Sequence, residues 1–335
     1  MFRIGHIVVL GLALLLPAVS FAATLKIASI APDGTSWMNE MRNGADEIKA
    51  RTGGRVSFRF YPGGIMGNDK SVLRKIRAGQ LHGGAVTGGG LAEIYPEANV
   101  YSIPFLFRSY DEVDYVRERM DPVLLEGLKQ QDFISFGFSE GGFAYLMSTS
   151  PIAGLDDLKG HKVWVPEGDE ISRAAFEASN VSPISLPLTD VLTGLQTGLI
   201  DTVAGSAIGA IALQWHTRVK YITDAPLAYL YGSLVIRRSA FERIAPADQA
   251  IVREVMSAVF DRMNRANRDD SERALNALRA QGIELVSPDL RERERWRNSV
   301  DTAMTRLLQN GLFSIEVMRQ VEGLLDSYRK AADAR

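Results

Sequence analysis

The sequence of 335 residues contains no cysteine, which excludes disulfide bonds, cysteine nucleophiles and thiolate metal sites. Histidine is scarce as well, because only four occur and the three beyond the N-terminal segment stand singly, without an H-x-x-x-H pair. The glycine-rich runs lack the lysine and the serine or threonine of a phosphate-binding loop. We therefore expect neither a metal ion nor a cofactor.

The chain also lacks an excess of charge of one sign. It has 38 basic and 40 acidic residues, a formal net charge of −2, and the two signs are mixed along its length. Without a basic stripe to meet phosphates, nucleic-acid binding is not expected. With 46% apolar and 23% charged residues the composition is that of an ordinary globular protein, and the length suggests about two domains.

Long apolar runs are missing except at the N-terminus. Arg3 gives a short basic start, residues 7–19 are almost wholly apolar, and small residues follow at Ser20 and Ala22, where a signal peptidase reads them. This pattern predicts a signal peptide over residues 1–22, cleaved near Ala22. The apolar run is shorter than the roughly 20 residues that span a bilayer, so we expect an exported protein that resides in the periplasm.

Strand and helix patterns alternate along the mature chain. Residues 25–30 and 56–60 are typical of strands, and apolar side chains recur at helical spacing between them. This order predicts a largely parallel sheet with helices on its faces, and such sheets bind ligands at the carboxyl ends of their strands. From Pro246 to Gln281 there is no glycine or proline, which predicts one helix of about 54 Å that runs along two lobes.

Four segments, at residues 61–67, 95–107, 157–166 and 195–201, together resemble one family. They read YPGGIMG, YPEANVYSIPFLF, DLKGHKVWVP and LQTGLID. In this order they resemble the substrate-binding proteins of tripartite ATP-independent periplasmic (TRAP) transporters, the C4-dicarboxylate-receptor-like family.

The resemblance implies a fold, a partner and a function. The fold is α/β, a two-lobed, type II-like periplasmic-binding-protein fold with mixed sheets flanked by helices and a long helix along both lobes. Lobe I would combine residues 24–147 with about 236–265, and lobe II residues 148–235 with about 266–330. The function is that of a monomeric, non-enzymatic receptor, which binds a small organic acid between the lobes and delivers it to small and large membrane subunits.

One position departs from the family pattern. Members usually carry an arginine where this chain has Trp164, and that arginine forks onto the carboxylate of the ligand. An indole offers a broad apolar face and one hydrogen-bond donor, so it cannot neutralise a carboxylate. The substitution leaves open which other groups meet the ligand.

Candidate ligand-binding residues follow from the resemblance and from the loops at strand ends. Uncharged hydroxyls can donate hydrogen bonds, glycines let backbone N–H groups approach an anion, and aromatic rings provide walls. A carboxylate that opens a helix either caps that helix or pairs with a ligand amine. The candidates are Trp164, Thr87, Gly88, Trp37, Phe143, Gly205, Ser206, Tyr231 and Asp169.

Three functional hypotheses remain open from the sequence. The first is a TRAP receptor for an organic acid, and the second is the same receptor fold for an aromatic, neutral or amine-bearing ligand. The third is a serine hydrolase, because Ser139 lies in a G-x-S-x-G pattern at residues 137–141. That chemistry needs a strand, a sharp turn and a helix around the serine, whereas residues 142–147 are typical of a strand.

Overall fold

The structure is a computed structural model that describes residues 23–334, so the predicted signal peptide lies outside the described residues. The strands are β1 (Ala23–Ser29), β2 (Val56–Tyr61), β3 (Gly83–Thr87), β4 (Phe133–Ser135), β5 (Ser139–Ser148), β6 (Trp164–Pro166), β7 (Ile184–Leu186), β8 (Thr202–Gly205), β9 (Tyr221–Thr223), β10 (Ala228–Arg237) and β11 (Glu284–Val286). Among residues 23–334, no helix is both long and apolar enough to cross a membrane.

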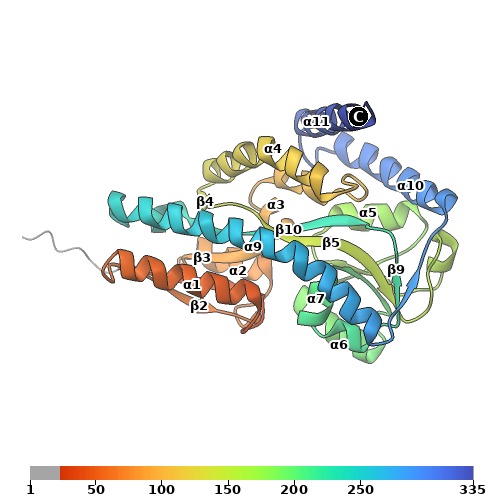
Figure 1. Ribbon diagram of the computed structural model, residues 1–335, viewed down its shortest axis with the longest axis horizontal. Coiled ribbons are helices and arrows are strands. Elements are labelled where there is room, and N and C mark those ends of the chain that lie inside the picture. The colour runs from red at the N-terminus through yellow and green to blue at the C-terminus, as the bar shows by residue number, and fades with distance from the viewer. Residues whose placement is uncertain (1–22, 335) are drawn as a thin grey trace, which may run out of the picture.

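Helices cover the strands on both sides (Figure 1). The α-helices are α1 (Ser36–Arg51), α2 (Asp69–Arg77), α3 (Gly88–Ala92), α4 (Tyr110–Gln130), α5 (Glu170–Ala178), α6 (Val191–Thr197), α7 (Ala207–Ala212), α8 (Arg238–Phe241), α9 (Pro246–Ala280), α10 (Leu290–Gln309) and α11 (Ile315–Asp333). The 3-10 helices are η1 (Pro96–Ser102), η2 (Leu155–Leu158), η3 (Leu188–Asp190) and η4 (Trp215–Thr217).

The main sheet is mixed, as the α/β prediction requires. Its strand order is β11-β9-β5-β10-β3-β1-β2, with β4 on β10 and β8 on β5, while β6 and β7 form a separate parallel pair. Strand β1 runs parallel to β2 and β3, and β10 runs antiparallel to β3 and β5. The parallel pairs are therefore those that the strand–helix–strand order predicts. The long strands β5 and β10 lie between these pairs in the sheet.

Strands β5 and β10 join the two lobes. Residues 139–144 of β5 pair with β10, whereas residues 145–148 pair with β8 and β9 on the other side of the molecule. The pairing of β5 with β10 is irregular between Leu230 and Tyr231. Figure 1 shows both strands crossing the middle of the molecule, so each lobe contains part of both strands.

The longest helix, α9, confirms the prediction for residues 246–281. It spans Pro246–Ala280, with Pro246 in its first turn and Gln281 as its C-cap, and is about 52 Å long. It packs against α1 at one end and against α7 at the other, with β5 between them. In Figure 1 it lies along both halves of the molecule, so it can brace the two lobes.

The last two helices pack on different elements. Helix α10 packs against α5, and α11 packs against α4 and η1. An ion pair fixes the second contact, because Arg329 of α11 lies 2.8 Å from Glu112 of α4. These contacts attach α10 to α5 and α11 to α4. The lobe boundaries expected from the sequence remain a prediction.

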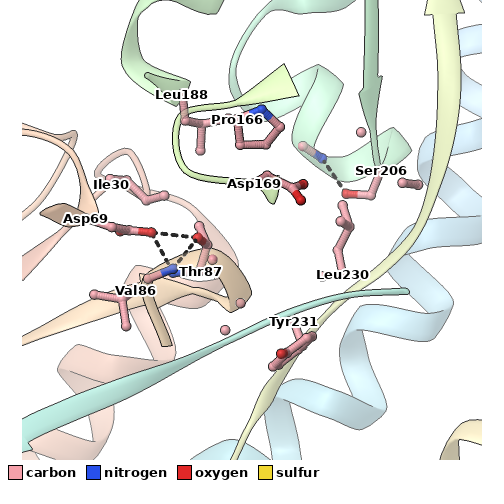
Figure 2. A pocket seen from close by; sticks show the side chains of 18 of the residues that line it. Ile30, Asp69, Val86, Thr87, Pro166, Asp169, Leu188, Ser206, Leu230 and Tyr231 are labelled. Atoms are coloured by element: carbon pink, nitrogen blue, oxygen red, sulfur yellow. Dashed lines mark hydrogen bonds between the residues drawn. The ribbon is translucent and has the colours of Figure 1, made fainter. Parts of the chain in front are cut away.

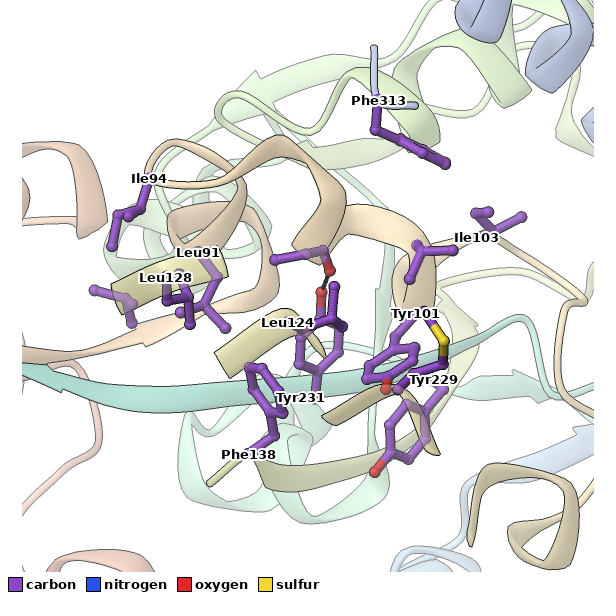
Figure 3. Close-up of a cluster of buried hydrophobic side chains, with 14 of the residues drawn as sticks. Leu91, Ile94, Tyr101, Ile103, Leu124, Leu128, Phe138, Tyr229, Tyr231 and Phe313 are labelled. Atoms are coloured by element: carbon purple, nitrogen blue, oxygen red, sulfur yellow. Dashed lines mark hydrogen bonds between the residues drawn. The ribbon is translucent and has the colours of Figure 1, made fainter. Parts of the chain in front are cut away.

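An aromatic core supports the crossing strands (Figure 3). The ring of Tyr231 lies edge-on to Tyr101 at 5.4 Å and to Phe138 at 5.8 Å, and it stacks on Tyr229 at 6.2 Å. The hydroxyl of Tyr231 donates to the carbonyl of Ala98 in η1. Large buried rings in fixed geometry make this region of β10 rigid, and one face of it borders the cleft described next.

Candidate ligand-binding cleft

A cleft of about 480 Å³ lies where the two lobes meet. Its lining combines the loop after β1 and the starts of α2 and α3 with the loop after β6, the start of α7 and the first halves of β5 and β10. Figure 2 shows Asp69 and Thr87 on one wall, across from Asp169 and Ser206. The loop after β1 and the start of α3 follow the carboxyl ends of parallel strands, the expected position for a ligand in this class of fold.

The structure brings most of the predicted site residues to this cleft and leaves one out. Those that line the cleft are Trp37, Thr87, Gly88, Trp164, Asp169, Gly205, Ser206 and Tyr231. Phe143 is not among the lining residues, because its ring packs in the core, 5.0 Å from the ring of Tyr110 and 5.9 Å from that of Tyr229. Contacts between the eight lining residues and a ligand remain a prediction.

Trp164, at the family's arginine position, is a packed residue with no free donor. It is 2% exposed, and its Nε1 donates to the carbonyl of Leu186 at 3.0 Å, across the β6–β7 pair. Its ring lies edge-on to Trp215 at 5.4 Å. Trp164 therefore presents apolar surface to the cleft, and neither charge nor a hydrogen bond is left for a carboxylate.

Asp69 is a cleft residue that the sequence analysis missed. Its Oδ2 accepts the Thr87 hydroxyl at 2.6 Å and the Thr87 amide at 3.0 Å, whereas its Oδ1 is buried with no hydrogen-bond partner among the described residues. Burial raises the pKa of Asp69, and the negative charge of Glu93 adds to that rise. A Cβ at position 90 would lie 2.7 Å from Asp69 Oδ2, so Gly90 makes room for this carboxylate.

On the opposite wall, Asp169 and Ser206 begin helices. Asp169 caps α5, because its Oδ1 accepts the Ser172 amide at 2.9 Å and its Oδ2 accepts the Ser172 hydroxyl at 2.6 Å. Burial raises the pKa of Asp169. Ser206 caps α7 by accepting the Gly209 amide at 3.2 Å, which leaves its hydroxyl hydrogen free to donate. Of the two roles expected for Asp169, the cap is present.

The two predicted glycines serve packing inside the protein. A Cβ on Gly88 would lie 3.0 Å from both the Ser102 hydroxyl and the Tyr231 ring, and a Cβ on Gly205 would lie 2.7 Å from the Trp215 ring. Each glycine therefore lets a neighbouring side chain approach the backbone beside the cleft. Gly89 is less crowded, because a Cβ there would meet only the Thr87 hydroxyl, at 3.7 Å.

Glu140 brings a buried charge network to the floor of the cleft. Its side chain is 2% exposed and lies 3.4 Å from Arg117 and 2.6 Å from Arg268. Arg117 also donates to the Tyr229 hydroxyl at 2.9 Å and pairs with Asp121 at 2.9 Å. Because both arginines neutralise it, Glu140 ties α4 and α9 to the start of β5 and is not a free charge in the cleft.

Ser139 does not have the geometry of a hydrolase nucleophile. It is the first residue of β5, and the strand continues to Ser148 with no turn and helix after the serine. The imidazole of His161 instead contacts the Ser150 hydroxyl at 3.0 Å and Asp201 at 2.9 Å, and none of these three residues lines the cleft.

Comparisons with known proteins place the chain among solute receptors. The sequence model of the bacterial extracellular solute-binding proteins, family 7, matches residues 27–310. The C4-dicarboxylate-binding periplasmic protein DctP of Rhodobacter capsulatus is 22% identical over 86% of this chain and 87% of its own. The sialic acid-binding periplasmic protein SiaP of Vibrio cholerae is 21% identical over 82% of this chain and 85% of its own.

Solved structures agree on the fold. A TRAP periplasmic solute-binding protein from Xanthobacter autotrophicus, with bound β-D-galacturonate, superposes with a TM-score of 0.83 at 19% identity, covering 90% of this chain and 99% of its own. One from Sulfurospirillum deleyianum, with bound succinate, has a TM-score of 0.83 at 17% identity, covering 91% and 99%. The two-lobed α/β fold predicted from the sequence is therefore confirmed.

Proposed function

Because the chain belongs to the bacterial extracellular solute-binding proteins, family 7, we propose that it is the periplasmic receptor of a TRAP-type secondary transporter. It captures a small organic acid in the interlobe cleft and delivers it to small and large membrane subunits. The observation that carries this proposal is the cleft of about 480 Å³ built from both lobes, a size typical of small-molecule sites. Succinate and galacturonate in the related receptors support an acid as the ligand.

The mechanism is a hinged clamp. The lobes share β5 and β10, so a small rotation about the irregular pairing at Leu230 and Tyr231 can open and close the cleft. Across the cleft mouth, the Asn68 amide of the first lobe donates to Glu167 of the second at 2.7 Å. A ligand that contacts both walls favours the closed state by its difference in affinity for the two states. The closed receptor is the form that docks on the membrane subunits.

A binding experiment tests this proposal. Protein released from the periplasm by osmotic shock, unfolded and refolded to remove bound solute, is titrated calorimetrically with succinate, D-glucuronate, β-D-galacturonate and galactonate. We expect saturable binding of at least one acid and its loss in Gly89→Trp, because residue 89 is open to the cleft and a large ring there fills the ligand space. Gly323→Ala, on an exposed face of α11, is the matched control. Acid binding that survives Gly89→Trp would place the site outside this cleft.

A further inference from the structure

The cleft presents aliphatic side chains from both walls and from its base, which we call the apolar band. They are Ile30 after β1, Leu188 in η3, Ile208 in α7, Leu213 at the end of α7 and Leu230 in β10. Each of them is half-buried and so keeps accessible surface inside the cleft. Figure 2 shows Ile30 on the wall of the first lobe and Leu188 on that of the second. Accessible apolar surface enclosed in a cleft is suited to the apolar part of a ligand.

The core of the second lobe supports the apolar band. Leu188, Ile208 and Leu213 pack against a buried cluster that contains Trp164 and Trp215. Trp164 also lines the cleft, and its one N–H is donated to a carbonyl of the chain. This wall therefore offers a firmly packed apolar surface, and the indole leaves no hydrogen bond for a ligand.

Several hydrogen-bond donors along the cleft are engaged by the chain itself. The amide and hydroxyl of Thr87 donate to Asp69, and those of Ser172 donate to Asp169. A ligand rich in hydroxyl groups needs a partner for each of them, and every hydroxyl left unpaired in a closed cleft lowers the affinity. An apolar body needs no such partners, so it matches a cleft whose donors already serve the two walls.

The positive charge of the cleft suits one acid group. Among the described residues that line it, Lys70 is the single one with a basic side chain. Glu93 and Glu167 line the cleft as well, and their charges would repel a second carboxylate. The lining therefore favours a monocarboxylate over a dicarboxylate.

We infer that the ligand is a monocarboxylate with an apolar body, whose hydrocarbon part contacts the apolar band and whose acid group lies toward Lys70. This inference rests on the proposed function and narrows its ligand class from organic acids to alkyl, cycloalkyl and aryl monocarboxylates. Sugar acids and short diacids bind more weakly, because their hydroxyls or second carboxylate lack partners in this cleft.

Matched pairs of solutes test this inference. Wild-type protein, refolded as above, is titrated calorimetrically with hexanoate against galactonate and with cyclohexanecarboxylate against D-glucuronate. The members of a pair share one carboxylate and the same chain length or ring size, and they differ in their hydroxyl groups. We expect the apolar member of each pair to saturate one site per chain and to bind about tenfold tighter or more. Since a buried methylene group raises affinity about fourfold, hexanoate should also bind about tenfold tighter than butanoate.

Two leucine variants locate the effect. Leu188→Asn replaces an aliphatic side chain of the apolar band by a polar one of similar size, so hexanoate should bind about tenfold more weakly and galactonate should not lose affinity by the same factor. Leu199→Asn is the matched control, because Leu199 is an exposed leucine of the same lobe that does not line the cleft. Thermal unfolding without ligand checks that both variants are folded. Unchanged hexanoate binding in Leu188→Asn, or an equal loss for both acids, contradicts the role of the apolar band.

The failure of this inference is distinguishable from the failure of the proposed function. If galactonate, D-glucuronate or succinate binds as tightly as the apolar acids, the inference is wrong and the organic-acid receptor stands. If none of these acids binds, or if 1-hexanol binds and no acid does, the proposed organic-acid function is wrong as well. The comparison of solutes uses the unaltered protein, so it does not depend on whether a variant folds.

Discussion

At the scale of single residues, the buried carboxylates that line the cleft are of two kinds, those paired with arginine and those held by neutral donors. Glu140 is buried between Arg117 and Arg268, and each of these arginines has a second carboxylate partner, Asp121 or Asp114. Asp69 and Asp169, by contrast, accept hydrogen bonds from neutral groups alone. Burial raises the pKa of both carboxyl groups. The Glu140 ion pairs join α4 and α9 to β5, whereas the hydrogen bonds of Asp69 and Asp169 order the two walls of the cleft.

The Glu140 network makes a stability prediction. Glu140→Gln removes one of the two carboxylates that each arginine contacts, at the most buried point of the network, so we expect the free energy of unfolding to fall by about 3 kcal/mol. Urea unfolding followed by tryptophan fluorescence measures the change. Glu254→Gln, which removes an exposed partner of Arg51, should leave the midpoint nearly unchanged. Equal midpoints for both variants would mean that Arg117 and Arg268 are satisfied without Glu140.

At the scale of elements, the long helix α9 depends on close contact with its neighbours. Gly44 of α1 faces Val259 of α9, and a Cβ on Gly44 would lie 2.6 Å from a methyl group of Val259. Since α9 also packs against α7 of the other lobe, its distance from α1 affects how the two lobes sit together. Glycine at position 44 is therefore required by helix packing.

A matched pair of glycine substitutions tests this contact. Gly44→Ala should lower the free energy of unfolding by about 1–3 kcal/mol, because the extra methyl group overpacks the α1–α9 interface. Gly323→Ala in α11, where no atom lies within 4 Å of the added Cβ, should raise it by about 0.5–1 kcal/mol through helix propensity. Thermal or urea unfolding of both variants shows whether each substitution lowers or raises the free energy of unfolding. If Gly44→Ala were more stable than the wild type, α9 could move away from α1 without an energetic cost.

At the scale of the whole molecule, connections of several kinds hold the two lobes together. Strands β5 and β10 pass between them, α9 lies along both, and a hydrogen bond from Asn68 to Glu167 closes the mouth of the cleft. The first two are continuous chain and persist when the cleft opens. The hydrogen bond is a side-chain contact that opening would break.

Loss of this hydrogen bond should shift the ligand-free protein toward the open state. One hydrogen bond contributes about 1 kcal/mol, so Glu167→Ala should change the ratio of open to closed molecules about fivefold. Small-angle X-ray scattering without ligand measures this as a larger radius of gyration. Glu177→Ala, which removes an exposed partner of Arg173 within α5, serves as the control. An unchanged scattering curve for Glu167→Ala means that the bond does not bias closure.

The sequence by itself determined the fold class, the order of motifs and the extent of α9. These features depend on local patterns, because Pro246 favours a helix start and Gly282, with a φ of 91°, favours a stop. The approximate location of the cleft could be predicted too, since residues 86–90 follow a strand, and the family resemblance added Ser206.

Only the tertiary structure decided what each cleft residue does. Asp69 meets Thr87 across 18 residues of sequence, and Trp164 gives its donor to Leu186 across 22, so neither contact is visible in a local pattern. Phe143 was expected to face a ligand and instead packs against Tyr110 and Tyr229 in the core. Hydrogen-bond partners and charge balance depend on the distances between segments far apart in the chain, and folding sets those distances.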